Sequence, residues 1–392
     1  MNLKKTALLG SLAAASLVTA QAQSSRPSVV VTIENTAPYN GGFLTPVWVG
    51  FHNGQFDSYD GGTAANTLPI MGSDAIERLA EDGNTGPISR DFSQLVPAGS
   101  QGTIRSNGPL PPLGPSQVAS QLFSVNPAEG RYFSYASMII PSNDAFVANG
   151  SPVAHEVFDT NGNFVAESFY ILGSQVDDAG TEVNDELPQN TAFFGQAAPN
   201  TGVDENGIIP GPGHPGLNPA SQGGVLASPN FQEADFTQDN YNLARVKFTF
   251  LDTAAPVLFQ SKANPMFENP APTIADGNSP EAQAFFFLDD DGESLVYFAF
   301  ANELSGDITA AHLHLAPLTQ NGPVVLPLRP LFGRFVFGQI DAEAVVGPLA
   351  NRPDALDALI AEMSAGTSYL NIHTAANPAG EIRGQVNISN LR

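Results

Sequence analysis

Short apolar runs, most of them ended by proline, glycine or a carboxylate, recur through this sequence and limit what it can fold into. Residues 28–34 and 46–51 are rich in β-branched and aromatic side chains, and in residues 244–251 apolar and polar side chains alternate. Runs of this length and period are typical of strands in a sheet that buries one face. Helical spacing of apolar residues indicates short helices at 74–82 and 354–363. The sequence therefore predicts an all-β fold.

Proline punctuation between residues 252 and 278 divides the chain into two parts. A chain of 392 residues is long enough for two or three domains of about 150 residues each. A stretch with repeated prolines reads as a semi-rigid linker. We expect two β-sandwich-like domains, and the predicted parts are a signal peptide (1–22), a sandwich domain (23–251), a linker (252–278) and a C-terminal β domain (279–392).

The first 22 residues have the layout of a secretory signal peptide. Lys4 and Lys5 precede an apolar run over residues 7–18, and Ala20-Gln21-Ala22 gives a small-x-small cleavage site. The apolar run is shorter than the about 20 residues that span a membrane, so no transmembrane anchor is expected. The chain has no cysteine, and two large domains do not need disulfide bonds. We expect a secreted or periplasmic protein.

The formal net charge of −24 bears on the choice of partner. Such a charge repels nucleic acids and anionic membrane surfaces, and it attracts cations. It also keeps an exported protein dispersed, which is the alternative explanation for the excess of carboxylates. Nucleic acid is therefore not an expected partner.

Two acidic loops follow strand-like runs in the first half of the chain. Residues 138–140 are followed by Pro141 and Asp144, and residues 169–172 are followed by Asp178 and Glu182 within a Gly-containing turn. Calcium takes six to eight oxygen ligands, which two such loops can supply without cysteine or histidine. The alternative is that these are solvated turn residues, because Asp and Gly are common in turns.

The same stretch resembles the spondin N-terminal domain known from F-spondin. The resemblance covers roughly residues 27–250, and its carriers are Leu44-Thr45-Pro46, His52-Asn53, Leu79-Ala80-Glu81-Asp82-Gly83, Ser-Met-Ile-Ile-Pro-Ser-Asn-Asp-Ala-Phe-Val (137–147) and Asp-Ala-Gly-Thr-Glu (178–182). It implies a β-sandwich with one calcium ion bound by Asp144, Asp178 and Glu182. Glu182 stands where we expect Asp, and its extra methylene alters how a carboxylate reaches the ion.

Three histidines of the C-terminal part lie in alternating runs. Alternation in residues 311–315 puts His312 and His314 on one face of a strand, and His373 lies in a similar run at 369–374. A His-x-His pair with a distant third His has the spacing of a zinc or copper site. The alternative is a structural polar cluster in which the imidazoles hydrogen-bond with Asn371, Glu381 or Arg383.

The C-terminal part also resembles the chordin-type (CHRD) domain. The resemblance spans roughly residues 279–390, and it is carried by Ala-His-Leu-His-Leu, Asn-Gly-Pro-Val-Val, Leu-Asn-Ile-His-Thr and Pro-Ala-Gly-Glu-Ile-Arg-Gly-Gln. It implies a β-rich secreted module without an established catalytic activity.

Three smaller features complete the prediction. Trp48, the single tryptophan, has apolar neighbours and is expected in a core. Residues 183–240 are dominated by Asn, Gln, Pro and Gly, so we expect a long surface loop in which His214 is solvated. The stretch Asp289-Asp290-Asp291-Gly292 is predicted to form a solvated hairpin turn, and the alternative is a calcium loop.

No Ser-His-Asp arrangement, nucleophile elbow or phosphate-binding loop stands out. The predicted function is that of an exported, calcium-binding, non-catalytic adhesion or interaction protein of the cell envelope, the extracellular space or the extracellular matrix. Its expected partner is an extracellular protein or polysaccharide. The alternative is a copper or zinc protein, or a redox enzyme, that uses the C-terminal histidines.

Overall fold

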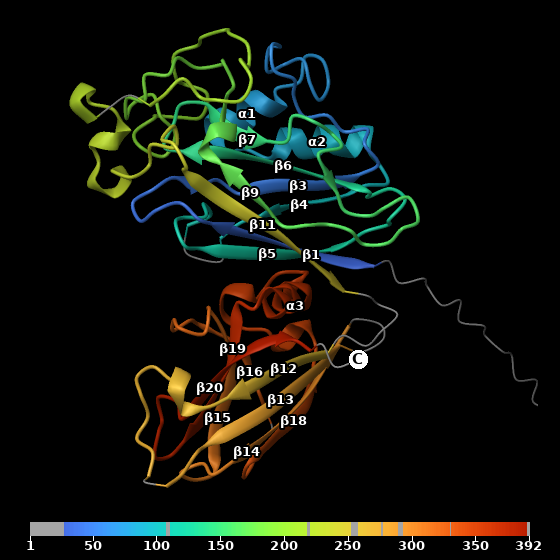
Figure 1. Ribbon diagram of the computed structural model, residues 1–392, viewed down its shortest axis with the longest axis vertical. Helices are drawn as coiled ribbons and strands as arrows, with labels where there is room; N and C mark the ends of the chain where they lie inside the picture. Colours follow the sequence, from blue (N-terminus) through green and yellow to red (C-terminus); the bar gives the residue numbers. More distant parts are fainter. Residues whose placement is uncertain are drawn as a thin grey trace, which may run out of the picture.

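The computed structural model describes residues 27–106, 110–217, 220–251, 258–275, 277–288, 293–329 and 331–389. The predicted signal peptide (1–22) and the predicted turn at 289–292 lie outside these residues. Within them the protein is all-β, as predicted, with three sheets and three short α-helices (Figure 1). Of the helices so described, none has the length and apolarity needed to cross a membrane.

The N-terminal unit is a sandwich of two antiparallel sheets. Its strands are β1 (Ser28–Asn35), β2 (Phe43–Leu44), β3 (Val47–His52), β4 (Ser100–Ile104), β5 (Val118–Ser124), β6 (Tyr132–Ile140), β7 (Ala145–Ala148), β8 (His155–Glu156), β9 (Phe169–Leu172), β10 (Asp177–Asp178) and β11 (Asn242–Leu251). One sheet has the order β5-β1-β11-β9, and the other has the order β10-β7-β6-β3-β4, with β2 and β8 paired to β6. Apolar side chains of both sheets fill the space between them.

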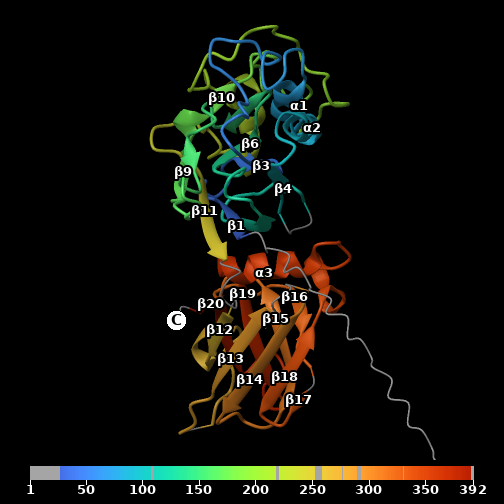
Figure 2. The ribbon, with the colours of Figure 1, turned by 90° about the vertical axis from the view of Figure 1, so that its right-hand side faces the viewer.

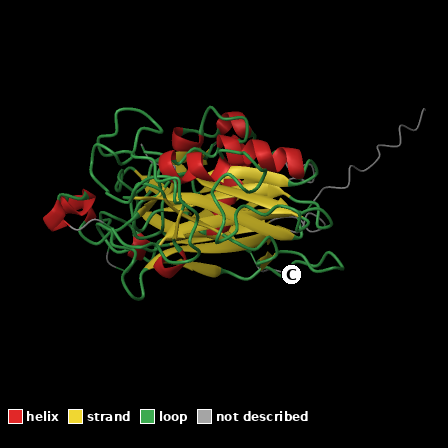
Figure 3. Cartoon of the chain, turned by 90° about the horizontal axis from the view of Figure 1, so that it is seen from above, coloured by secondary structure: helices red, strands yellow, loops and turns green. Residues whose placement is uncertain are grey.

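Two helices cover the outer face of the larger N-terminal sheet. They are α1 (Ala75–Asp82) and α2 (Gly86–Leu95), and Figure 3 shows helices along one side of the strands. Trp48 of β3 packs there against Phe56 and Phe92, with ring centroids 5.1 and 5.3 Å away. The indole is fully buried, which confirms that Trp48 is a core residue.

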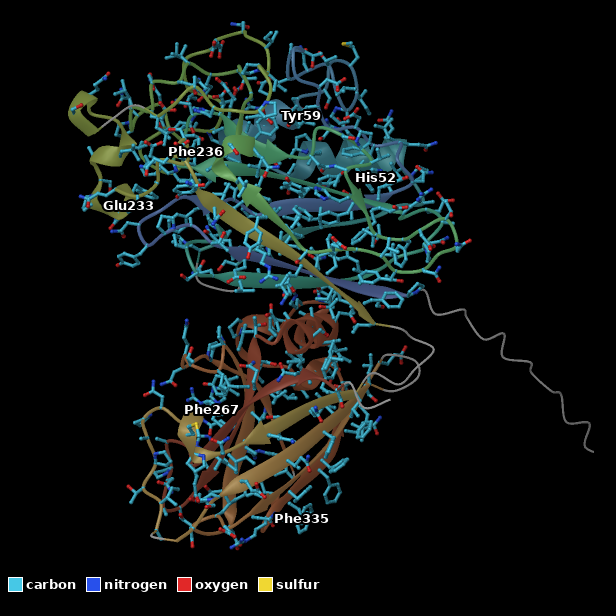
Figure 4. The ribbon with its side chains drawn as sticks, in the orientation of Figure 1. His52, Tyr59, Glu233, Phe236, Phe267 and Phe335 are labelled. Atoms are coloured by element: carbon cyan, nitrogen blue, oxygen red, sulfur yellow. The ribbon has the colours of Figure 1, made fainter. Side chains whose placement is uncertain are left out.

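The C-terminal unit is one rolled sheet. Its strands are β12 (Leu258–Ala263), β13 (Glu281–Leu288), β14 (Leu295–Asn302), β15 (Ile308–Leu315), β16 (Val324–Pro327), β17 (Leu331–Phe332), β18 (Phe335–Ile340), β19 (Ser368–Thr374) and β20 (Ile382–Ile388). The order is β16-β15-β19-β20-β12-β13-β14-β18-β17. The sheet curls so far that β17, at one end, contacts β15 near the other. Phenylalanines lie on its outer surface, among them the exposed Phe335 (Figure 4).

The predicted linker over residues 252–278 is wrong in its second part. Residues 258–263 of it form β12, which lies inside the C-terminal sheet between β20 and β13. The short 3-10 helix η5 (Pro265–Phe267) follows. Residues 258–263 contain no proline or glycine. Every residue can therefore donate its backbone N–H to the neighbouring strands of the sheet. The C-terminal unit therefore begins before residue 279.

The helix α3 (Ala355–Ala365) lies between the two units, as Figures 1 and 2 show. It confirms the helix predicted for 354–363. It contacts β1 and β5 of the sandwich and β19 and β20 of the rolled sheet. Val30 and Leu251 of the sandwich belong to the same apolar cluster as the helix. Most side chains of α3 are buried, and the exposed Asp357 is the exception, so the helix is packed between the two units.

The predicted loop at 183–240 has no strand among its described residues. It contains the single-turn helices η2 (Ala220–Gln222), η3 (Val225–Ala227) and η4 (Pro229–Phe231), while η1 (Gly173–Gln175), η6 (Ala342–Ala344) and η7 (Gly347–Leu349) lie elsewhere. The expectation that His214 is solvated is wrong. Its side chain is buried, and its ring meets that of Phe236 edge-on at 5.3 Å, because the loop folds back over the sandwich.

Candidate metal centres

The acidic loops of the N-terminal unit meet at the end of β7. Asp144 directly precedes β7, and Asp178 of β10 is paired with Ala145. Gly180 turns the chain between Asp178 and Glu182 with φ +64°, and a Cβ at this position would lie 2.6 Å from a backbone oxygen. Only glycine fits this turn. The strand pairing and the turn together bring the three predicted carboxylates into one region.

Asp144 is held by the backbone of the second acidic loop. Its Oδ2 accepts hydrogen bonds from the backbone N–H groups of Thr181 (2.8 Å) and Glu182 (3.0 Å) and from the Thr181 hydroxyl (3.2 Å). Its Oδ1 is buried and has no hydrogen-bond partner. A buried carboxylate oxygen without a donor is costly. Asp144 thus offers one free oxygen toward its surroundings.

Burial and mutual repulsion raise the pKa values in this region. The pKa of Asp144 rises to about 7, because of burial first and the neighbouring Asp178 second. The pKa of Glu182 rises to about 8, because of burial first, then the charges of Glu81 and Asp144. These carboxyl groups are therefore harder to ionise together than solvated ones, and a bound cation would relieve the repulsion.

Glu81 is a member of this region that sequence reasoning did not assign to it. It belongs to α1, its side chain is buried, and its charge acts on Glu182. Arg78 pairs with Glu81 and, at 2.6 Å, with Asp82, so this guanidinium is engaged by acids of its own helix. The only signal in the sequence was the position of Glu81 in a run that carried the spondin resemblance.

The ligand atoms of Asp144, Asp178 and Glu182 are not as close to one another as those of the three histidines. Among the described residues, one group of three or more His, Asp or Glu has ligand atoms that all lie within 4.8 Å of one another, and it is His312, His314 and His373. Asp178 also accepts one hydrogen bond at each carboxylate oxygen, from the Gly180 backbone (2.8 Å) and from Asn184 (2.7 Å), which leaves each oxygen a further lone pair. The calcium site remains a prediction.

The histidine cluster lies on one face of two paired strands. His312 and His314 of β15 are opposite Asn371 and Tyr369 of β19, and His373 is opposite Ala310. The ring centroid of His312 is 5.7 Å from that of His314 and 5.1 Å from that of His373. The three imidazoles therefore converge, as alternation along each strand predicts.

Hydrogen bonds to backbone carbonyls orient two of the rings. His314 Nδ1 lies 2.8 Å from the Gly322 oxygen, and His373 Nδ1 lies 3.1 Å from the Pro378 oxygen. Because a carbonyl oxygen only accepts, each Nδ1 carries the proton, and each neutral ring keeps its lone pair on Nε2. His314 Nε2, His373 Nε2 and His312 Nδ1 have no hydrogen-bond partner.

Burial favours the neutral forms of His312 and His314. Burial, followed by the charges of His373, His314 and Arg329, lowers the pKa of His312 to about 4. Burial is also the main cause that lowers the pKa of His314. Neutral imidazole is the form that binds metals.

The polar partners expected for the cluster bond elsewhere. Arg383 pairs with Glu268 at 2.9 Å, and Asn371 also donates to Glu268. Glu381 accepts from Thr374 and from the backbone of Ser305. We expected these residues to hydrogen-bond with the imidazoles. The backbone carbonyl groups of Gly322 and Pro378 are the hydrogen-bond partners instead.

The sandwich and the rolled sheet define an all-β protein of two units. Residues 259–386 match the family model of the CHRD domain. This match supports the resemblance predicted for the C-terminal part, and its first residue lies in β12. CHRD domains are non-enzymatic interaction modules of extracellular and secreted proteins. No curated protein and no solved structure matches the chain. The family match does not extend to residues 23–251, where the spondin resemblance stays a prediction.

Proposed function

We propose that this chain is a non-catalytic interaction protein that acts outside the cytoplasm and binds one calcium ion through Asp144, Asp178 and Glu182. The observation that carries the proposal is the buried Asp144 Oδ1, which has no donor although three hydrogen bonds fix the other oxygen of the same carboxylate. Carboxylate and backbone oxygens are the ligands that calcium prefers.

In this proposal calcium stiffens the acidic loops that end the sandwich, and those loops contact an extracellular protein or polysaccharide. The net charge of −24 favours capture of a cation and disfavours an anionic partner. The CHRD match of the C-terminal unit supports a role in interaction. Glu81 contributes negative charge to the same site through its effect on Glu182.

A calcium titration of the full chain tests the proposal. Calorimetry should find one site per chain, with an affinity in the range of extracellular modules, about 10⁻⁴–10⁻³ M, or tighter. Asp144→Asn should weaken binding at least about tenfold, since a charged ligand is lost. Glu233→Gln is the matched control, because Glu233 is an exposed acid of the same unit (Figure 4). Absence of binding at several millimolar calcium, or equal binding by Asp144→Asn and wild type, would overturn the proposal.

A further inference from the structure

We propose that His312, His314 and His373 bind one late transition-metal ion, Cu(II) or Zn(II), through three neutral imidazoles and leave a coordination position open to an external ligand. This site is separate from the proposed calcium site. The two sites lie in different units and use different ligand atoms.

The direction of the ring nitrogens is the first support. Three nitrogens without hydrogen-bond partners belong to the three rings that converge. In His314 and His373 the opposite nitrogen donates to a backbone carbonyl, which fixes the tautomer with the lone pair on the free atom. Metal-binding histidines are held in this way by a bond from the second ring nitrogen.

The alternative of a structural polar cluster leaves these nitrogens unexplained. Within the described part of the chain no hydrogen bond links one imidazole of the cluster to another. Buried polar atoms without partners cost free energy, so a purely structural cluster would be expected to pair its rings. A shared metal ion satisfies all three atoms at once.

The layer beside the rings keeps them in place. The Tyr369 ring stacks on His314 with centroids 4.9 Å apart, and the Arg383 guanidinium lies 4.3 Å from the Tyr369 centroid. Arg383 is anchored in turn by buried Glu268. Strands β15, β19 and β20, which carry these residues, are neighbours in the sheet (Figure 2). Such support lowers the cost of holding ligands in a binding geometry.

The ligand set selects the class of metal. Three imidazoles without a carboxylate suit zinc and copper rather than calcium or magnesium, which prefer oxygen. Copper(II) should bind more tightly than zinc(II), following the general order of affinities for divalent ions. The three side chains are half-buried, and their unpartnered nitrogens are buried atoms. Three protein ligands on a four-coordinate ion leave one position for water or an anion.

Metal titration of the full chain, freed of metal by chelator, tests this inference. Copper(II) sulfate and zinc chloride are added in separate experiments with a competing chelator. We expect one equivalent of each at a dissociation constant below about 1 µM and tighter binding of copper. Loss of a residue that only hydrogen-bonds to a metal ligand typically weakens metal binding about 10–100-fold. His312→Ala and His373→Ala each remove a ligand, so each should weaken binding by more than this. His155→Ala, which removes a half-buried imidazole of the other unit, should bind like wild type.

A measurement on the unaltered chain guards against variants that fail to fold. The protein contains six histidines, and ¹⁵N-labelled imidazoles report on each. Zinc should shift the nitrogen signals of three of them, and calcium chloride should leave these three unchanged, which separates this result from the calcium proposal. If fewer than three signals shift, if His52, His155 or His214 respond instead, or if no site tighter than about 1 µM exists, the inference is wrong.

Discussion

Arg383 of β20 and Glu268, which follows η5, form an ion pair of 2.9 Å whose side chains are 2% and 0% exposed. This pair ties the segment predicted as linker to the strand beside the histidine cluster. Glu268→Ala leaves a buried guanidinium without its carboxylate partner, although Asn321 Oδ1 still accepts from it, and such a loss typically costs about 3–5 kcal/mol. Urea unfolding should show a loss of this size.

The matched control for that substitution is Glu156→Ala. Arg131 and Glu156 also pair closely, at 2.7 Å, but their side chains are 33% and 40% exposed. Solvent screens such a pair, so its loss should cost less than about 1 kcal/mol. Equal losses in the two variants would show that burial does not decide the strength of the Arg383–Glu268 pair.

The metal-free protein should lose stability as the pH rises from about 6.5 to about 9. The folded-state pKa values of Asp144 (about 7) and Glu182 (about 8) lie above their ordinary values of 3.8 and 4.5. Their contribution is complete below the unfolded pKa and is lost as the pH passes the folded pKa. His52 and His155, whose pKa values are lowered by burial, contribute fully above about pH 6.5 and do not mask the effect.

Thermal unfolding in chelator across this pH range measures the effect. Asp144→Asn should flatten the decline, and calcium should abolish it if the proposed site is real. A melting temperature that rises from pH 6.5 to 9 without calcium would contradict the raised pKa values.

Phe92→Ala should destabilise the N-terminal unit by about 3–5 kcal/mol. Phe92 is buried between Trp48 and Phe56, with ring centroids 5.3 and 5.0 Å away, so truncation leaves a cavity. Because Trp48 is the only tryptophan, its emission should also shift to longer wavelength. Phe335→Ala removes an exposed ring and should change the unfolding free energy by less than about 0.5 kcal/mol.

The two units should unfold together because α3 is shared. Val30→Asp places a charge in the apolar cluster that contains α3, and we expect it to uncouple the units. Trp48 fluorescence follows the N-terminal unit, and far-ultraviolet circular dichroism follows both. The two melting curves should coincide in wild type and separate in Val30→Asp. Val31→Ala, in the interior of the sandwich, is the control and should lower the melting temperature of both curves by the same amount. Melting curves that differ in the wild-type protein would refute the coupling.

Local periodicity in the sequence was enough to predict the face on which the histidines lie. His312 and His314 alternate with leucines, and antiparallel pairing carries His373 to the same face. The carbonyl groups that orient the rings belong to Gly322 and Pro378. They lie in turns, whose conformation has no period to read, so these contacts could not be predicted.

The error at β12 has its cause in proline. Pro256 and Pro265 flank β12 and suggested a linker, although the interval between them is long enough for a strand. Pro87, by contrast, occupies the first turn of α2, where its missing N–H has no partner to lose. The spacing between prolines, and their place within an element, carried more information than their number.

The position of α3 between the two units has a consequence for how they move. The N-terminal sandwich lies toward one end of the long axis, the rolled sheet lies toward the other, and α3 lies between them (Figure 1). Because side chains of this helix contact β1 and β5 on one side and β19 and β20 on the other, we expect the two units to reorient together rather than independently. Independent reorientation would require the helix to separate from β1 and β5.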